Sequence, residues 1–260
     1  MNWLMTLGGA LTGFLVGLTG VGGGSLMTPL LMLVFGVAPL TAVGTDLWFA
    51  ATTKVVAAAM HRGHGTIDWP IVRRLWLGSL SASAATLWWM KTRPVDHSSV
   101  HLMTVSIAVA LLLTAFGILF QKRLHGLGSH LRDVDKAQFH KLQPGLTVAA
   151  GVVLGVLVTL TSVGAGAIGT VALVYLYPRR LTPPRLIATD IVHAIPLALF
   201  AGVGHLMLGD VNVGMLGGLL LGSIPGVIVG TKLSTRLPHH WLRALLALLL
   251  LVISARMLMH

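Results

Sequence analysis

The sequence predicts an all-α integral membrane protein made of two inverted repeats of five apolar elements, in which the first two elements of each repeat form a glycine-broken hairpin. Composition is the first observation: 55% of the 260 residues are hydrophobic and 10% are charged, and the mean hydropathy is +0.87. A helix needs roughly 20 apolar residues to cross a bilayer. Four runs approach this length, which excludes a soluble domain: residues 142–160, 185–206, 211–230 and 241–259.

An internal repeat is the second observation. Pairing each residue with the one 142 positions later gives nine identities in the 16 positions from 9 to 24, and pairing at 144 positions continues through Asp46 and His61 to Pro94. We therefore expect a first repeat at residues 1–120, a cytoplasmic linker at 121–141 and a second repeat at 142–260. The first copy predicts five helices, which the second copy repeats: 3–19, 25–36, 41–60, 70–90 and 98–120.

The distribution of Lys and Arg selects the topology. The second element has about 12 residues and measures about 18 Å as a helix, which is too short to cross a bilayer alone. If the first two elements form a hairpin, 14 Lys and Arg lie on one side of the membrane and 3 on the other, whereas a single broken crossing divides them 9 to 8. The positive-inside rule favours the hairpin, places both termini outside the cytoplasm and inverts the second copy. It also accounts for the net charge of +11 without a nucleic-acid partner.

Each hairpin contains a cluster of small residues where the apolar run is interrupted. Thr19-Gly20-Val21-Gly22-Gly23-Gly24 returns as Thr161-Ser162-Val163-Gly164-Ala165-Gly166. Broken helices at corresponding positions of two repeats indicate a transporter's central site, and free backbone N–H groups at a helix start attract anions. The predicted substrate-binding residues of the two tips are Thr19, Gly20, Gly22, Gly23, Gly24, Ser25, Thr161, Ser162, Gly164 and Gly166.

Other glycines are spaced by four residues and favour close helix packing instead of binding. They are Gly13 with Gly17, Gly151 with Gly155, and the series Gly218, Gly222, Gly226 and Gly230.

Four ionisable residues lie inside apolar runs, where charge makes function the default hypothesis: Asp46, Lys54, Asp190 and His193. Asp46 and Asp190 are equivalent in the repeat, and either couple protons to transport or satisfy a helix end. Lys54 either binds the substrate anion or neutralises one of the aspartates. His193 lies one turn beyond Asp190. We add it, with Thr45 and Thr189, to the predicted substrate-binding residues.

The remaining polar and aromatic residues predict neither a metal site nor an enzyme. The twelve histidines form no HExxH motif, and the chain has no cysteine, so we expect no metal and no cofactor. His61 and His205 recur at one repeat position and are interpreted as interfacial caps. Motifs of hydrolases and nucleotide-binding enzymes are absent from the sequence. Aromatic residues beside basic ones predict a membrane-interface belt: Trp88, Trp89, Tyr175 and Tyr177.

Three segments carry a resemblance to a known family. They are the run from Gly17 to Ser25 followed by Pro29, the run Ala42-Val43-Gly44-Thr45-Asp46-Leu47, and the run Gly65-Thr66-Ile67-Asp68-Trp69. Together they closely resemble the sulfite exporter TauE/SafE family, also called TSUP, over residues 8–258. The resemblance implies a bacterial inner-membrane secondary carrier for a small sulfur-containing or organic anion, such as sulfite, thiosulfate, a sulfonate or sulfoacetate.

The combined expectation is a carrier that moves its anion by alternating access. Its partners would be the anion, protons as the coupling ion through Asp46 and Asp190, and the lipid bilayer, and a homo-oligomer is compatible with the sequence. An anion channel built on the same glycine-rich tips is the alternative.

Overall fold

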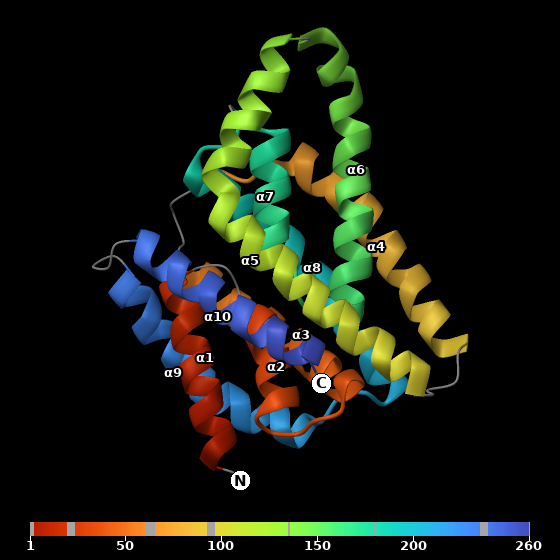
Figure 1. Cartoon of the computed structure of the whole chain (residues 1–260), viewed down its shortest axis with the longest axis vertical. Helices are drawn as coiled ribbons and strands as arrows, with labels where there is room; N and C mark the ends of the chain where they lie inside the picture. Colours follow the sequence, from red (N-terminus) through yellow and green to blue (C-terminus); the bar gives the residue numbers. More distant parts are fainter. Residues whose placement is uncertain are drawn as a thin grey trace.

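The computed structural model describes residues 3–19, 24–60, 66–92, 97–134, 136–178, 180–234 and 239–259, and within them it contains α-helices and no strand (Figure 1). The all-α prediction is confirmed. The helices of the first half are α1 Trp3–Thr19, α2 Gly24–Leu33, α3 Pro39–Met60, α4 Trp69–Thr92 and α5 His97–Val134. Those of the second half are α6 Lys136–Thr161, α7 Ala167–Leu176, α8 Pro183–Leu208, α9 Val213–Ser234 and α10 His239–Met259.

Each half begins with a full helix followed by a short one, as the repeat predicts. The short helices α2 and α7 have 10 residues each, so each spans only about 15 Å. Four longer helices are apolar enough to cross a membrane over Val100–Phe120, Lys141–Thr161, Pro184–Leu208 and Val213–Ser234. The inversion of one half relative to the membrane stays a prediction.

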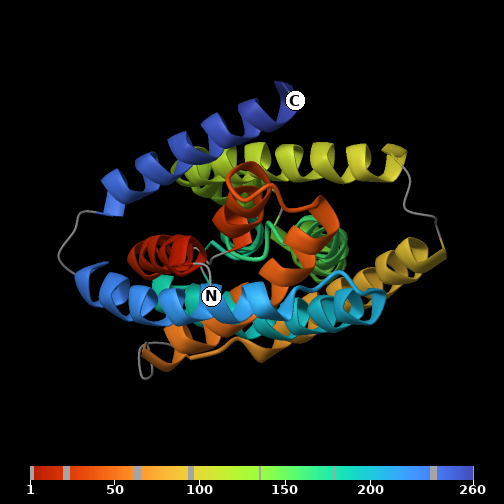
Figure 2. The same cartoon turned by 90° about the horizontal axis from the view of Figure 1, so that it is seen from below.

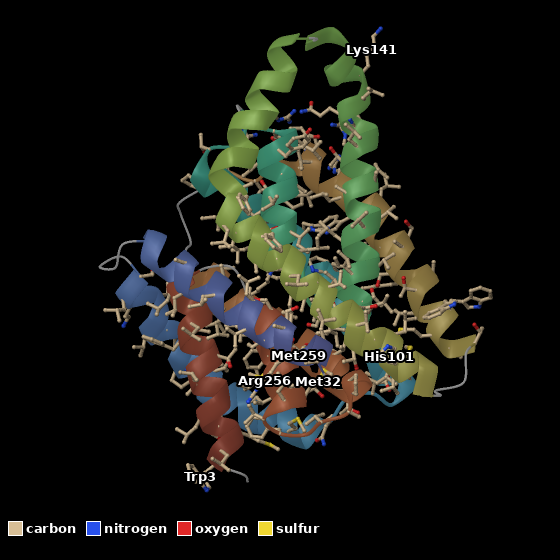
Figure 3. All side chains as sticks on the ribbon, viewed as in Figure 1. Trp3, Met32, His101, Lys141, Arg256 and Met259 are labelled. Atoms are coloured by element: carbon tan, nitrogen blue, oxygen red, sulfur yellow. The ribbon has the colours of Figure 1, made fainter. Side chains whose placement is uncertain are left out.

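The segment between the halves continues the helices on either side of it. α5 runs on to Val134 and α6 begins at Lys136. In Figure 1 these two ends project together beyond the other helices. Figure 3 shows Lys141 at this end of the molecule and Trp3 at the opposite end, with His101 and Arg256 in the half of the molecule nearer Trp3.

Helices of one half pack mainly against helices of the other. α1 lies along α9, and α4 lies along α6. Viewed along the molecule, α5 and α10 form one side, α4, α8 and α9 form the other, and the short helices α2 and α7 lie between them (Figure 2). The short helices that follow the two breaks in the apolar runs therefore lie in the interior.

Glycines set the closeness of the two cross-half pairs. A Cβ added at Gly13 would lie 2.4 Å from the carbonyl oxygen of Ser223, and one at Gly226 would lie 2.4 Å from that of Ala10. The packing role predicted for the eight spaced glycines is confirmed for seven, where an added Cβ would lie under 3.0 Å from backbone of the facing helix: Gly13, Gly17, Gly151, Gly155, Gly222, Gly226 and Gly230. Gly218 is the exception, because an added Cβ would meet only the Met5 Cβ at 3.8 Å.

Candidate functional site

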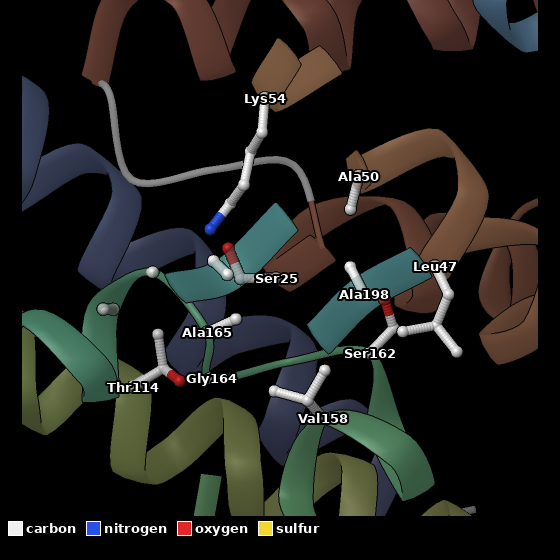
Figure 4. Close-up of a pocket in the computed structure, with 13 residues that line it drawn as sticks. Ser25, Leu47, Ala50, Lys54, Thr114, Val158, Ser162, Gly164, Ala165 and Ala198 are labelled. Carbon is white, nitrogen blue, oxygen red and sulfur yellow. The ribbon is translucent and has the colours of Figure 1, made fainter. Parts of the chain in front are cut away.

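A small cavity lies where the interrupted helices of both halves meet (Figure 4). Its volume is about 20 Å³, measured as the space open to the centre of a water molecule, which is room for one or two waters. α2, α3 and α5 of the first half line it, together with α6, α7, α8 and the 162–166 break of the second half. The lining residues are Ser25, Leu47, Ala50, Lys54, Thr114, Val158, Ser162, Gly164, Ala165, Gly166, Ala167, Ala194 and Ala198.

The second-half break has a specific backbone shape. α6 ends at Thr161, whose hydroxyl donates to Leu157 O at 2.6 Å and accepts the N–H of Val163 at 3.1 Å. Ser162 then adopts a φ of 59° and Gly164 a φ of 114°. Positive φ is uncommon for a residue with a side chain and costs on the order of 1 kcal/mol. Thr161 therefore shapes the break, while Ser162 is held in a strained conformation at the cavity wall.

The start of α7 also faces the cavity. Gly166 occupies the N-cap position without a side-chain cap, and Ala167 is the first helical residue. The N–H of Gly169 donates back to Gly164 O at 3.0 Å. The N–H groups of a first helical turn have no partner within the helix and carry the positive end of its dipole. The cavity thus has an electropositive backbone wall beside Gly166.

Three buried polar atoms on the cavity wall have no hydrogen-bond partner among the described residues: Lys54 Nζ, Thr114 Oγ1 and Ser162 Oγ. Lys54 extends from α3 with its nitrogen toward Ser25 (Figure 4) and is only 7% exposed. Buried polar groups are nearly always paired, and an unpaired one costs about 1–3 kcal/mol. Because three such groups meet in one cavity, they could together bind water or a ligand that accepts hydrogen bonds.

Thr114 is a cavity residue that the sequence analysis missed. Within the same apolar run, Thr104 donates to Val100 O at 3.0 Å, as helix threonines commonly do. Thr114 makes no such bond. A hydroxyl in the middle of a strongly apolar span was the available signal.

Asp46 lies behind the cavity wall and holds α2 against α3. Its Oδ2 accepts the N–H of Thr28 at 3.0 Å and the Thr28 hydroxyl at 2.5 Å, whereas Oδ1 has no hydrogen-bond partner among the described residues. The carboxylate is also close enough to the Ser162 side chain of the second half to interact with it. Asp46 is fully buried and does not line the cavity. Of the two roles left open for this aspartate, satisfying a broken helix has direct geometric support.

Asp190 occupies the equivalent position on α8 without an equivalent bond. A Cβ added at Gly169 of α7 would lie 2.8 Å from Asp190 Oδ1, so this carboxylate faces the short helix of its own half. In the described structure Oδ1 has no hydrogen-bond partner. The charges of Lys54 and Asp190 attract each other, although no direct ion pair joins them. Lys54 thus lines the cavity and is also within electrostatic reach of Asp190.

The other three predicted side chains bind protein atoms away from the cavity. Thr45 Oγ1 accepts the N–H of Asn212 at 3.1 Å, and Thr189 Oγ1 accepts the N–H of Asp68 at 3.1 Å. His193 Nε2 lies 3.0 Å from Ser79 Oγ on α4, and its Nδ1 has no partner in the part of the chain that the structure describes.

Part of the first-half tip cannot be placed. Gly20, Gly22 and Gly23 lie outside the described residues. Thr19 ends α1 and Gly24 begins α2, so Ser25 represents this tip at the cavity.

An ion cluster joins the halves at some distance from the cavity. Asp68, which is fully buried, accepts two hydrogen bonds from Arg180 at 2.7 and 2.8 Å and lies 3.1 Å from Arg185. The Asp68 carboxylate raises the pKa of the Arg180 guanidinium, because the hydrogen bond favours the charged form.

The belt prediction for Tyr177 is wrong. Tyr177 is fully buried, its hydroxyl lies 2.6 Å from Thr147 Oγ1, and Arg180 sits 5.9 Å from its ring centre. Trp88, in contrast, is 70% exposed. Among the described residues, no group of His, Asp or Glu is arranged to hold a metal ion.

The amino-acid sequence is similar to those of known proteins. Residues 5–257 match the family model described as sulfite exporter TauE/SafE. The probable membrane transporter protein YjnA of Bacillus subtilis (strain 168) is 36% identical over 254 residues, which cover 97% of this chain and 98% of that protein. The probable membrane transporter protein YdhB of the same organism is 28% identical over 88% of each chain. No solved structure matches the chain significantly.

Proposed function

Because the chain belongs to the sulfite exporter TauE/SafE family of membrane transporters, we propose that it is a secondary carrier whose substrate is a small anion bound in the cavity beside Lys54. The chain is a multi-pass membrane transporter and not an enzyme. We propose its substrate, its transport cycle and its coupling ion.

The unpartnered ammonium of Lys54 is the observation that carries the assignment. A buried charge without a counter-ion in contact is costly, and a bound anion removes that cost. The oxygens of an oxyanion would accept hydrogen bonds from Lys54 Nζ, Thr114 Oγ1 and Ser162 Oγ, and from the N–H groups at the start of α7. The cavity has room for one or two waters, so it would have to widen to admit an oxyanion, and a compact one such as sulfite, thiosulfate or a short sulfonate requires less widening than a bulky one.

Alternating access has a physical basis in how the cavity is built. Both halves contribute wall residues. In each half, a long helix ends and a short helix begins a few residues later, and both short helices contribute to the wall. Inverted repeats that meet at a central site allow one bundle of helices to rock against another. Because α1 lies along α9 and α4 lies along α6, each moving bundle would combine helices of both halves. The linker would be cytoplasmic and both termini would lie outside the cytoplasm of a bacterial inner membrane.

Proton coupling is assigned to Asp46 and Asp190, with Asp190 in the central role. In the empty carrier, Lys54 attracts the ionised Asp190 carboxylate. An anion bound to Lys54 would compensate the same positive charge, so the carboxylate loses stabilisation and takes up a proton. Anion and proton would then cross together, and the net charge of the loaded site would not increase.

The test is flux into proteoliposomes of sulfite, thiosulfate and sulfoacetate, each with and without a pH gradient. We expect saturable uptake of at least one anion that increases with an inward proton gradient. Lys54→Met should abolish uptake, whereas Lys91→Met, which removes an exposed lysine outside the cavity, should leave it unchanged. Asp190→Asn and Asp46→Asn should retain anion exchange and lose the response to the gradient.

Three results would count against the proposal. Uptake that does not saturate indicates the alternative, an anion channel. An equal loss of anion uptake in Lys54→Met and Lys91→Met would show that the cavity beside Lys54 is not the anion-binding site. If anion uptake still responds to the pH gradient in both asparagine variants, the aspartates do not couple protons to transport.

A further inference from the structure

His205 is a buried histidine that the proposed transport cycle does not use. It lies in the last turn of α8 and is fully buried. Its ring touches two oxygens: Nδ1 lies 3.2 Å from Asp210 Oδ2, and Nε2 lies 2.9 Å from the backbone carbonyl of Thr159 on α6. The imidazole therefore bridges the α8–α9 turn and the last part of α6.

A proton count shows what this arrangement requires. A carbonyl oxygen only accepts hydrogen bonds, so Nε2 must carry a proton to bond Thr159. A neutral imidazole has one N–H, which leaves a lone pair on Nδ1 facing the Asp210 carboxylate. Two lone pairs at 3.2 Å repel, whereas one more proton turns the contact into a charge-assisted hydrogen bond. Both ring contacts can be hydrogen bonds at once only if the pair holds one proton more than neutral histidine and ionised aspartate.

We propose that His205 and Asp210 form a proton-binding site, an imidazolium paired with a carboxylate, at the turn between α8 and α9. Asp210 is 17% exposed while His205 is fully buried, so the carboxylate gives the buried ring a route to water. Histidine is the side chain whose charge changes most readily between pH 5 and 8.

The local backbone holds the pair together. The N–H of Asp210 donates to His205 O at 2.9 Å, and Gly209 turns the chain with a φ of 83°. On the other side, a Cβ added at Gly44 of α3 would lie 2.6 Å from Asp210 O and 3.1 Å from His205 Cβ. Two residues beyond Asp210, the N–H of Asn212 donates to Thr45 of α3. The turn is thus fixed on α3, and the ring fixes it on α6.

The contact with Thr159 connects the pair to the cavity. Val158, which directly precedes Thr159 on α6, lines the cavity. Helix α6 ends at Thr161, before the strained Ser162. Loss of the proton would set the Asp210 carboxylate against the Nδ1 lone pair and weaken the hold of the ring on α6. Protonation of the pair therefore strengthens the hold of the ring on the end of α6 that borders the cavity, and deprotonation weakens it.

Other charged groups on the surrounding helices do not pair with this ring. Among the described side chains, Asp210 is the charged group in contact with the imidazole. The charged side chains described on the helices packed against α8 are Asp46 and Lys54 on α3, Arg73, Arg74 and Lys91 on α4, and Lys141 on α6. Asp68, which precedes α4, pairs with Arg180 and Arg185. The state of His205 is thus set mainly by Asp210.

This role rests on the proposed carrier function, since it assigns a pH response to the same cavity. With the predicted topology the α8–α9 turn faces away from the cytoplasm. External protons would then control how freely the cavity opens on that side. The proton-coupling aspartates act within the transport cycle, whereas this pair would act on the helix that borders it.

The experiment is ¹⁵N-histidine solid-state NMR of the full chain in liposomes between pH 5 and 9. We expect one signal, missing in His205→Gln, that shows both ring nitrogens protonated at low pH and loses one proton as the pH rises. Asp210→Asn offers an amide donor to Nδ1, so His205 should then carry a single proton, on Nε2. A His205 signal with one protonated nitrogen at every pH in the unaltered protein would overturn the proposal.

Anion exchange measured on the same samples separates this proposal from the carrier function. Asp210→Asn should flatten the dependence of exchange on external pH, and His101→Gln, which alters an exposed histidine on α5, should not. A doubly protonated His205 without any anion flux would refute the carrier and keep the proton site. Flux with the same pH dependence in both variants would refute the coupling of the proton site to the cavity.

Discussion

The hydroxyl of Thr189 accepts the backbone N–H of Asp68, 121 positions earlier in the chain, at 3.1 Å. Thr45 makes the equivalent bond to Asn212 in the other half, also at 3.1 Å. Asp68 and Asn212 stand directly before α4 and α9. Helix α8, which carries Thr189, therefore anchors the start of α4, and α3, which carries Thr45, anchors the start of α9. In both cases the anchored helix belongs to the opposite half.

We predict that Thr189→Val lowers the free energy of unfolding by about 1 kcal/mol, because it leaves the buried N–H of Asp68 without a partner, and that Thr45→Val lowers it by less, because its partner Asn212 is exposed. Thr104→Val is the matched control. Its hydroxyl bonds only the carbonyl of its own helix, so little change is expected. Unfolding in detergent with increasing SDS measures the difference. Equal behaviour of the three variants would mean that the cross-half bonds do not contribute.

A second prediction concerns Thr114, whose hydroxyl faces the cavity without a partner. Thr114→Val should weaken anion binding by about tenfold, the equivalent of roughly 1.4 kcal/mol, because one donor to the bound anion is lost. Stability without the anion should not fall, since no protein bond is removed. Anion-dependent shifts of the melting temperature measure the affinity.

The control for Thr114 is Thr53→Val on α3. The Thr53 hydroxyl donates to Phe49 O at 2.9 Å, so this change should leave affinity unaltered. An unaltered affinity in Thr114→Val would show that the anion does not reach α5.

A third prediction tests the glycine contact between α1 and α9. Gly226→Ala would place its Cβ 2.4 Å from Ala10 O, and the backbones must separate to accept it. Overpacking of this kind costs about 1–3 kcal/mol. Gly217→Ala on the same helix has no atom within 4 Å and should be neutral or slightly stabilising, because alanine favours helix over glycine. Thermal unfolding of both variants is the measurement.

A fourth prediction concerns topology, for which the absence of cysteine gives a clean background. Met259→Cys, near the end of α10, should react with a membrane-impermeant maleimide on intact cells. Ser129→Cys, between the halves, should react only after the membrane is opened. The reverse pattern would place the termini in the cytoplasm and contradict the charge count.

The helices were largely predictable because apolar length and the internal repeat are local properties. The predicted segment 41–60 became Pro39–Met60, and the short second element became Gly24–Leu33. The spacing of Gly13 and Gly17 likewise predicted close packing, although it did not reveal that the partner would be Ser223 and its neighbours on α9.

The site was predictable only in part, because the direction of a side chain depends on contacts made far along the chain. Lys54 and Ser25 do line a cavity with Ser162 and Gly164, as the two-tip hypothesis requires. Thr45 and Thr189 stand next to the aspartates in sequence, yet their hydroxyls point to the opposite half. Tyr177 resembled an interface residue until Thr147, 30 positions earlier, proved to be its partner.

The packing of α1 on α9 has a consequence for biosynthesis. The glycine-lined face of α1 enters the membrane first, and the helix that covers it begins only at Val213. Until then that face must be covered by lipid or by other proteins. Nascent chains truncated before α9 should therefore be degraded rapidly, and folding should be completed only when the last two helices are inserted.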